Sequence, residues 1–462
     1  MKMKIIQITF IALAISGSLI AQQRFEPTWE SIDSREIPSW YTSAKFGIFI
    51  HWGVYSVPAW APANIDIGKN FGQKFSEWYW WRLEDPKNEY VRPHHEKLYG
   101  DKNYQEFAPE FKAEFFDPVQ WADIFKRSGA RYVVLTSKHH DGYTLWPSEQ
   151  SWNWNSMDVG AKRDLCGDLS EAVKEAGLHM GFYYSLYEWF NPLYNSDLNM
   201  YVNTHMIPQM KDLIVRYEPD IFWTDGEWSH TSDKFKSTEF LAWLYNESPV
   251  KNKVVVNDRW GKETRSRHGG FYTTEYNHVH GQEGIGEKSY HPWEECRGIG
   301  GSFGWNRTEN LENYSSSEEL VHILIDKVAN GGNLLLNIGP TGDGRIPVIM
   351  QQRLSDIGKW LIVNGEAIYE TQVWKKSGSN MKKNHVYYTT KEDVFYVICT
   401  KWHEIIEVPH ISKCSKVTLL GSDLKIDYKL NNGKLIITAP LVNPETVPCE
   451  YAYVYKIWNA RY

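Results

Sequence analysis

The chain has 462 residues, a net charge of −7 and an aromatic fraction of 15%, including 22 tryptophans. This length is sufficient for one large domain and a smaller one. The acidic balance argues against a nucleic-acid partner, because a phosphate backbone requires a basic surface. The aromatic excess favours ligands with partly apolar faces, such as sugars, over a core that is merely rich in aromatic residues.

The first 21 residues have the pattern of a secretory signal peptide. Two lysines precede an apolar run over residues 5–19, and a cleavage site follows Ala21. The alternative is an uncleaved membrane anchor, which the short length and the polar residues of the run disfavour. No later segment is apolar for long enough to span a membrane, so we expect no stable membrane insertion. We expect a periplasmic or secreted protein, or a lysosomal one if the source is a eukaryote.

Eight short segments share one pattern, a run of β-branched or aromatic residues that ends in polar residues. Continuous apolar runs of this kind are typical of strands buried on both faces, as in a parallel sheet. The segments predicted as strands are 47–53, 132–142, 179–185, 221–227, 254–260, 270–276, 302–306 and 333–340.

Helical patterns fill several of the gaps between these segments. The predicted helices cover residues 117–128, 168–177, 198–217, 233–246, 316–329 and 351–363. Alternating strands and helices predict a (β/α)8-like TIM barrel over residues 22–368. The gap between the fifth and sixth strands is too short for an ordinary helix. The long segment 54–116 follows the first strand and could cover the mouth of the barrel.

Residues 369–462 have a different pattern, with short alternating strands and Asn/Gly turns. This pattern predicts a small C-terminal antiparallel β-sandwich. The sandwich could bind carbohydrate or brace the barrel, and we favour bracing because it lacks an obvious exposed aromatic platform. The five cysteines are scattered and lack metal-type spacing, which excludes a disulfide scaffold and a cysteine-based metal site. A single disulfide in the C-terminal region stays open.

Polar residues at the ends of the predicted strands indicate an active site, because barrel enzymes build their sites from the loops at the carboxyl ends of the strands. A metal-dependent hydrolase on a barrel usually needs two histidines that point the same way from the first strand, as in His-x-His, whereas that segment here is His51-Trp52-Gly53 and lacks one of the two ligands. His139 and His140 are adjacent and would point to opposite faces of a strand. We therefore expect no metal.

Glycoside hydrolysis instead needs two carboxyl groups flanking the scissile bond. Asp225 is short and precedes a glycine, as suits a nucleophile, and the longer Glu275 suits an acid/base. A retaining mechanism places the two carboxyls roughly 5–5.5 Å apart. Two structural alternatives stay open: Asp225 as a helix N-cap, and Glu275 as a simple ion-pair partner of Arg259.

Four motifs in order, FGIFIHWGVYSVPAW, TSKHHDGYTLW, FWTDGEW and GGNLLLNIGPTGDG, resemble those of glycoside hydrolase family 29, the α-L-fucosidases. The resemblance extends from about residue 25 to 370, and the sandwich that follows also fits the family. It implies an exo-acting, retaining enzyme that removes terminal α-linked L-fucose from glycans without a metal or organic cofactor.

The resemblance also implies roles for particular residues. Asp225 matches the nucleophile of the family, and Trp223 and Phe303 are candidates for the wall that contacts the fucose methyl group. The residues that match those lining the fucose pocket are His51, Glu77, Trp78, His139, His140, Tyr183, Trp223, Arg259 and Phe303.

The acid/base is less sharply defined, because this region diverges within the family. Glu275 is the first choice, Glu294 in PWEEC the alternative and Glu295 a distant third, whereas Glu227 is expected to support neighbouring loops. The expected partners are fucosylated glycans or glycoconjugates, and a homo-oligomer is compatible with the sequence. The competing function is a non-catalytic fucose- or glycan-binding protein built on the same barrel.

Overall fold

The computed structural model describes residues 24–65, 71–276, 278–279, 282–283, 291–374 and 384–462. The predicted signal peptide, residues 1–21, lies outside these residues. Within the described part of the chain, no helix is both long and apolar enough to cross a membrane.

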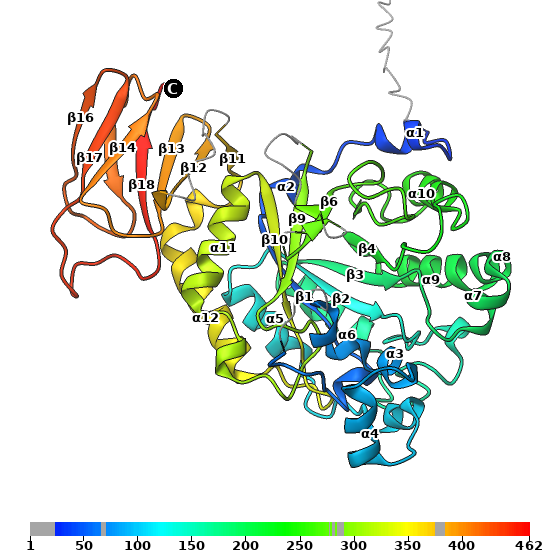
Figure 1. The fold of residues 1–462 in the computed structure, drawn as a ribbon. Coiled ribbons are helices and arrows are strands. Elements are labelled where there is room, and N and C mark those ends of the chain that lie inside the picture. Colours follow the sequence, from blue (N-terminus) through cyan, green and yellow to red (C-terminus); the bar gives the residue numbers. More distant parts are fainter. Residues whose placement is uncertain (1–23, 66–70, 277, 280–281, 284–290, 375–383) are drawn as a thin grey trace, which may run out of the picture.

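Eight parallel strands form the central sheet (Figure 1), in the spatial order β5, β4, β3, β2, β1, β10, β9 and β6. A parallel bridge between Asn257 and Phe271 joins the chain after β5 to the chain before β6, so the sheet closes. The predicted (β/α)8-like barrel is confirmed. Its strands are β1 (Phe46–Ile50), β2 (Tyr132–Lys138), β3 (His179–Ser185), β4 (Ile221–Asp225), β5 (Val255–Val256), β6 (Tyr272–Glu275), β9 (Trp293–Gly298) and β10 (Gly332–Ile338).

The seventh barrel strand lies elsewhere than the sequence predicts. It is β9, residues Trp293–Gly298, and the predicted strand 302–306 is a loop. The sequence pattern does not reveal this strand, because it contains two glutamates. Glu294 and Glu295 are buried carboxyls that have partners on opposite faces of the sheet. Glu294 accepts hydrogen bonds from two buried tyrosines, and Glu295 lies 3.2 Å from the ammonium of Lys327. Glu294 is therefore a residue of β9.

The segment between β5 and β6 has no helix in the structure, as its length predicts. After β6 a small antiparallel extension, β7 (His278–Val279) and β8 (Gln282–Glu283), continues the sheet. This side of the barrel is consequently built from loops and short strands.

Helices surround the other strands, as Figure 1 shows. Their bounds are α1 (Trp29–Asp33), α2 (Ser39–Ala44), α5 (Pro118–Arg127), α6 (Leu165–Glu175), α7 (Pro192–Ser196), α8 (Leu198–Tyr201), α9 (Ile207–Tyr217), α10 (Ser237–Asn246), α11 (Ser317–Ala329) and α12 (Val348–Asn364). α6 begins three residues before its predicted start, because Asp164 caps it by accepting from the Gly167 amide. At α11 a reciprocal capping box joins Ser316 and Glu319.

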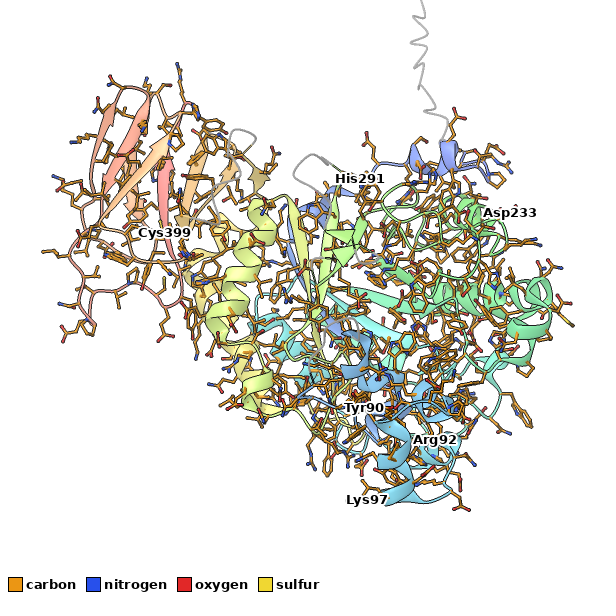
Figure 2. All side chains as sticks on the ribbon, in the orientation of Figure 1. Tyr90, Arg92, Lys97, Asp233, His291 and Cys399 are labelled. Carbon is orange, nitrogen blue, oxygen red and sulfur yellow. The ribbon has the colours of Figure 1, made fainter. Side chains whose placement is uncertain are left out.

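The segment after β1 contributes α3 (Tyr79–Glu84) and α4 (Val91–Tyr99). His94 and His95 belong to α4. His95 is buried against the Tyr79 hydroxyl, and His94 stacks on Trp60 with ring centres 3.9 Å apart. Both histidines are packing residues. Figure 2 shows α4, marked by Arg92 and Lys97, far from the C-terminal sheets that carry Cys399.

The C-terminal region consists of two antiparallel sheets around a separate apolar core. This confirms the predicted fold of that region. One sheet has the order β11 (Gln372–Val373), β12 (Val386–Lys391), β13 (Val394–Cys399), β18 (Tyr453–Trp458) and β15 (Lys416–Leu419); the other has the order β14 (Ile405–Pro409), β17 (Lys434–Thr438) and β16 (Asp427–Asn431).

The sandwich contacts the barrel through α11 and α12. The Trp360 indole donates to the Ala452 carbonyl at 2.9 Å, and a His322 ring nitrogen lies 2.8 Å from the Tyr451 carbonyl. All five cysteines are free thiols, so the disulfide left open for this region does not form.

Candidate active site

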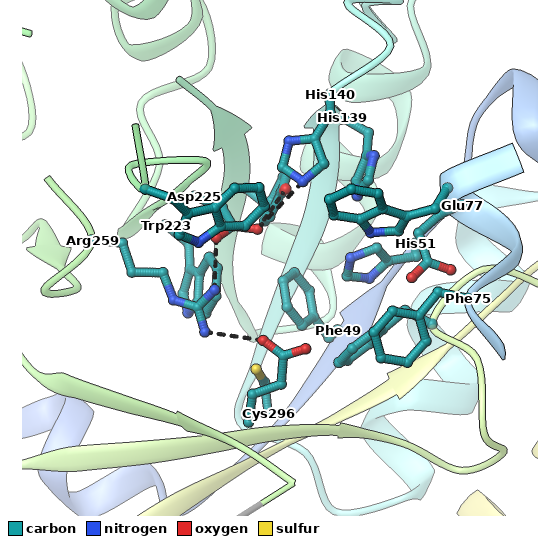
Figure 3. Close-up of a pocket in the computed structure, with 15 residues that line it drawn as sticks. Phe49, His51, Phe75, Glu77, His139, His140, Trp223, Asp225, Arg259 and Cys296 are labelled. Atoms are coloured by element: carbon teal, nitrogen blue, oxygen red, sulfur yellow. Dashed lines mark hydrogen bonds and ion pairs between the residues drawn. The ribbon is translucent and has the colours of Figure 1, made fainter. Parts of the chain in front are cut away.

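A pocket lies among the carboxyl ends of the barrel strands (Figure 3) and encloses about 430 Å³ of empty space. It brings together Asp225, Glu275 and all nine residues predicted to contact the sugar. The lining residues are Phe49, His51, Phe75, Glu77, Trp78, His139, His140, Tyr183, Trp223, Asp225, Trp228, Arg259, Glu275, Cys296 and Phe303.

Asp225 is held by three neighbours at the end of β4. Its carboxylate accepts from Arg259 Nη1 at 2.7 Å and from the Tyr183 hydroxyl at 2.9 Å, and His140 Nε2 lies 3.8 Å away. Burial is the largest single influence and would raise its pKa, but the charge and hydrogen bond of Arg259, together with His140 and the Gly226 amide, lower the pKa to about 2. Asp225 is therefore ionised at neutral pH. It does not serve as a helix cap, because the next helix begins only at Ser237.

Glu275 ends β6 and lies on the other side of the same guanidinium. Its Oε2 lies 3.4 Å from Arg259 Nη2, and 32% of its side chain is exposed. Burial and the negative charge of Asp225 raise its pKa, and Arg259 opposes them only in part. The pKa values of Asp225 and Glu275 are thus shifted in opposite directions within one cavity, which is the division that nucleophilic and acid/base roles require.

Arg259 does more than form one ion pair. It contacts both carboxyls, its Nε donates to the Thr273 hydroxyl at 3.1 Å, and its guanidinium lies 4.4 Å from the centre of the Trp223 ring. These contacts determine where the positive charge lies in the pocket.

Glu294 and Glu295 do not line the cavity. Glu294 lies behind the Trp223 wall, where it accepts from Tyr132 at 2.6 Å, Tyr41 at 2.9 Å and the Trp223 indole at 3.0 Å. Burial raises its pKa to about 7. Glu295 faces Lys327 on α11. Of the three candidates for the acid/base, only Glu275 reaches the pocket.

Three histidines line the pocket in their neutral form. Burial lowers the pKa of His51 to about 3, that of His140 to about 4 and that of His139 well below its ordinary value. His51 Nδ1 contacts Asn337 at 2.7 Å and His140 Nδ1 contacts Ser185 at 2.6 Å, which orients both rings. Neutral imidazoles can both donate to and accept from sugar hydroxyls.

The expectation that His139 and His140 point to opposite faces is wrong. Both line the pocket, with ring centres 4.2 Å apart. The reason is that β2 ends at Lys138, so the strand alternation stops before this pair. Within the described part of the chain, no group of three His, Cys, Asp or Glu side chains is arranged to hold a metal ion.

Glu77 and Trp78 reach the pocket from a short 3-10 turn, Ser76–Trp78, in the segment after β1. Glu77 accepts from the Gly304 amide at 2.8 Å and the Ser302 hydroxyl at 3.2 Å, and burial raises its pKa to about 7. These bonds tie the turn to the 302–306 loop that carries Phe303, so the two loops form one wall.

Four lining residues escaped the sequence analysis: Phe49, Phe75, Trp228 and Cys296. Phe49 and Trp228 lie in segments with recognised motifs, and their type alone could have marked them as sugar contacts. Cys296 was hidden because its strand, β9, was assigned elsewhere. Phe75 carries no local signal, since only the folded loop brings it to the cavity.

A closed barrel whose mouth holds two carboxyls of opposite pKa shift, surrounded by aromatic and imidazole side chains, is typical of glycoside hydrolases. The model of the α-L-fucosidase family matches residues 12–366, and that of the α-L-fucosidase C-terminal domain matches residues 379–458. The chain belongs to the α-L-fucosidase family.

Individual relatives agree over nearly the whole chain. Tissue α-L-fucosidase of Rattus norvegicus is 42% identical over 460 residues, which cover 97% of this chain and 95% of the relative. α-L-Fucosidase of Dictyostelium discoideum is 42% identical over 98% of this chain and 99% of the relative. The structure of Thermotoga maritima α-fucosidase in complex with fucose is 36% identical, with a TM-score of 0.78 over 94% of this chain and all of that one.

Proposed function

We propose that this protein is an exo-acting, retaining α-L-fucosidase that hydrolyses terminal α-linked L-fucose from glycans through a covalent fucosyl-enzyme. The observation that carries the proposal is the pair Asp225 and Glu275 on opposite arms of the Arg259 guanidinium. Their pKa values are shifted in opposite directions, which suits Asp225 to act as the nucleophile and Glu275 as the acid/base.

In the first step, Glu275 gives its proton to the glycosidic oxygen while Asp225 attacks the anomeric carbon. The bond to the leaving sugar breaks, and that sugar departs as an alcohol. In the second step, Glu275 takes a proton from water, which displaces Asp225 and releases fucose. Tyr183 and Arg259 hold the Asp225 oxygens throughout. When water displaces Asp225 from the sugar, the carboxylate regains its negative charge and its ion pair with Arg259.

The pocket walls account for a 6-deoxy sugar. His51, His139, His140 and Glu77 supply hydrogen-bonding groups for ring hydroxyls, while Trp223 and Phe303 offer apolar surface for the C6 methyl group. Phe49 and Phe75 extend that surface.

Export is part of the proposal. The signal-peptide pattern of residues 1–21 supports it, and a curated relative, 41% identical, is named plasma α-L-fucosidase of Homo sapiens. The mature chain would then act in a periplasm, outside the cell or in a lysosome, according to the source.

The test is release of nitrophenol from 4-nitrophenyl α-L-fucoside. The 4-nitrophenyl β-L-fucoside, α-L-rhamnoside and β-D-galactoside are assayed separately for comparison. We expect hydrolysis of the α-L-fucoside alone, unchanged by EDTA and absent in Asp225→Ala. NMR of the first-formed product should show the α-anomer, since two displacements retain the configuration. Tight fucose binding without hydrolysis of this substrate or of a panel of fucosylated oligosaccharides would identify a non-catalytic binding protein instead.

A further inference from the structure

A second cleft lies beside the catalytic pocket, and its space, which is open to solvent, is about 690 Å³. Its aromatic lining comprises Trp80, Trp152, Trp154 and Phe190, and Gln150 and Asn191 contribute amides. The Trp152 side chain is 78% exposed, and Phe190 is 37% exposed. A tryptophan this exposed buries little of its apolar ring in the fold, so it has surface left for a ligand.

The lining indicates a neutral saccharide. Flat rings pack against the C–H faces of pyranoses, and amide and carboxylate groups hydrogen-bond hydroxyls. The lining contains no lysine or arginine. The carboxylate of Glu188 is already paired with Lys138 at 2.5 Å and His205 at 2.8 Å. An acidic sugar would therefore meet carboxylates without a free cation.

The cleft and the catalytic pocket share a wall. His140 lines the pocket, and the next residue, Asp141, lines the cleft. On the other side of that wall, the Trp189 amide donates to the His140 carbonyl at 2.9 Å, between Glu188 and Phe190 of the cleft. The two cavities are thus separated by a single layer of residues.

Accessible aromatic rings connect the two cavities along the surface. Trp228 of the catalytic pocket lies 6.3 Å from Tyr187, and Tyr187 lies 6.4 Å from Trp81. Trp81 lies 6.1 Å from Phe190, which lies 4.5 Å from Trp80 in the cleft. All these distances join ring centres. Every ring along this path except Trp80 is at least partly exposed, which provides a continuous surface for a chain of sugars.

We propose that this cleft binds the distal sugars of a neutral oligosaccharide whose terminal fucose occupies the catalytic pocket. The preferred substrate is accordingly an extended fucosylated glycan, with its leaving-group chain lying along the path from Trp228 to Trp80. The proposal rests on the proposed fucosidase activity for its kinetic test, whereas its binding test does not.

The kinetic test compares Trp152→Ala with wild type on three substrates: 4-nitrophenyl α-L-fucoside, a fucosyl disaccharide and a fucosylated neutral oligosaccharide of five or more sugars. Loss of the stacking surface should lower kcat/KM about tenfold for the long oligosaccharide alone. Trp458→Ala, a partly exposed tryptophan of the C-terminal sandwich, is the matched control and should change none of the three. Equal losses on all substrates, or no loss on the long one, would overturn the proposal.

The binding test uses the same long oligosaccharide without its fucose, titrated calorimetrically into wild type, Trp152→Ala and Trp458→Ala. We expect binding to wild type and Trp458→Ala and its loss in Trp152→Ala; a sialylated form should bind more weakly. Absence of binding to wild type, or equal binding to all three proteins, would reject the cleft as a sugar site. A protein that binds this oligosaccharide but hydrolyses no fucoside would refute the proposed function and leave the cleft intact.

Discussion

Trp223, which lines the catalytic pocket, donates its indole N–H to the Glu294 carboxyl at 3.0 Å. This hydrogen bond fixes the pocket wall to a carboxyl that lies behind it. The same carboxyl accepts from Tyr41 and Tyr132. The bonds from the two tyrosines hold the Glu294 carboxyl in place, and this carboxyl in turn orients the Trp223 ring, which lines the pocket. We therefore expect Glu294 to act through Trp223 as a positioning residue, a role distinct from the one proposed for Glu275.

Glu294→Gln should leave catalysis largely intact and change the pH dependence of stability. The folded-state pKa of Glu294 is about 7, above the ordinary value near 4.3, so folding holds its proton more tightly. Its stabilising contribution is present below about pH 4 and is lost as pH rises through 7. Glutamine has no such proton. The free energy of unfolding of wild type minus that of the variant should therefore fall between pH 4 and 7 in urea titrations; a constant difference would contradict this assignment.

Glu275→Ala should lose about 10²–10⁴-fold in kcat on fucosides with poor leaving groups, because general acid help is gone. The loss on aryl fucosides with good leaving groups should be smaller in the first step. Azide should restore turnover and yield a fucosyl azide, since it attacks without a general base. Glu294→Gln serves as the buried-carboxyl control and should show no azide effect. Full activity of Glu275→Ala on a poor leaving group would exclude it as the acid/base.

Arg259→Gln should move the acidic limb of the pH profile. Without the guanidinium, burial dominates at Asp225, so its pKa rises from about 2 and the carboxylate is lost at higher pH. The acidic limb of kcat/KM for 4-nitrophenyl α-L-fucoside should therefore shift to higher pH, with a lower maximum. Circular dichroism controls for folding. A lowered maximum with an unshifted limb would mean that Arg259 does not control the ionisation of Asp225.

Trp360→Ala should weaken the attachment of the sandwich to the barrel. Trp360 is 1% exposed, and its indole donates to the Ala452 carbonyl of the C-terminal region. A cavity of this size costs about 3–5 kcal/mol, so the melting temperature should fall. At temperatures where the variant is folded, turnover of the aryl fucoside should match wild type, since α12 does not reach the pocket. A large loss of kcat without loss of stability would show that the sandwich does more than brace.

Much of the fold and of the candidate site can be predicted from the sequence. Strands such as 132–138 and 333–338 contain runs of apolar residues because a barrel buries both faces of its strands. Polar residues gather where those strands end, which marks Asp225, Arg259 and Glu275 before any coordinates are known. The helix that starts at Ser317 follows from its capping box, a signal confined to four neighbouring residues.

Other features depend on contacts between residues far apart in the chain. β9 carries two glutamates whose type predicts exposure, and their burial is stabilised by distant partners that include Tyr41, Tyr132 and Lys327. The same contacts withdraw Glu294 from the pocket and leave Glu275 there. Phe75 and Trp228 likewise reach the cavity through loops. Local patterns determine which residues form strands and helices, whereas pKa values, cavity walls and the choice between two carboxyls are set by charges and donors that meet only when the barrel closes.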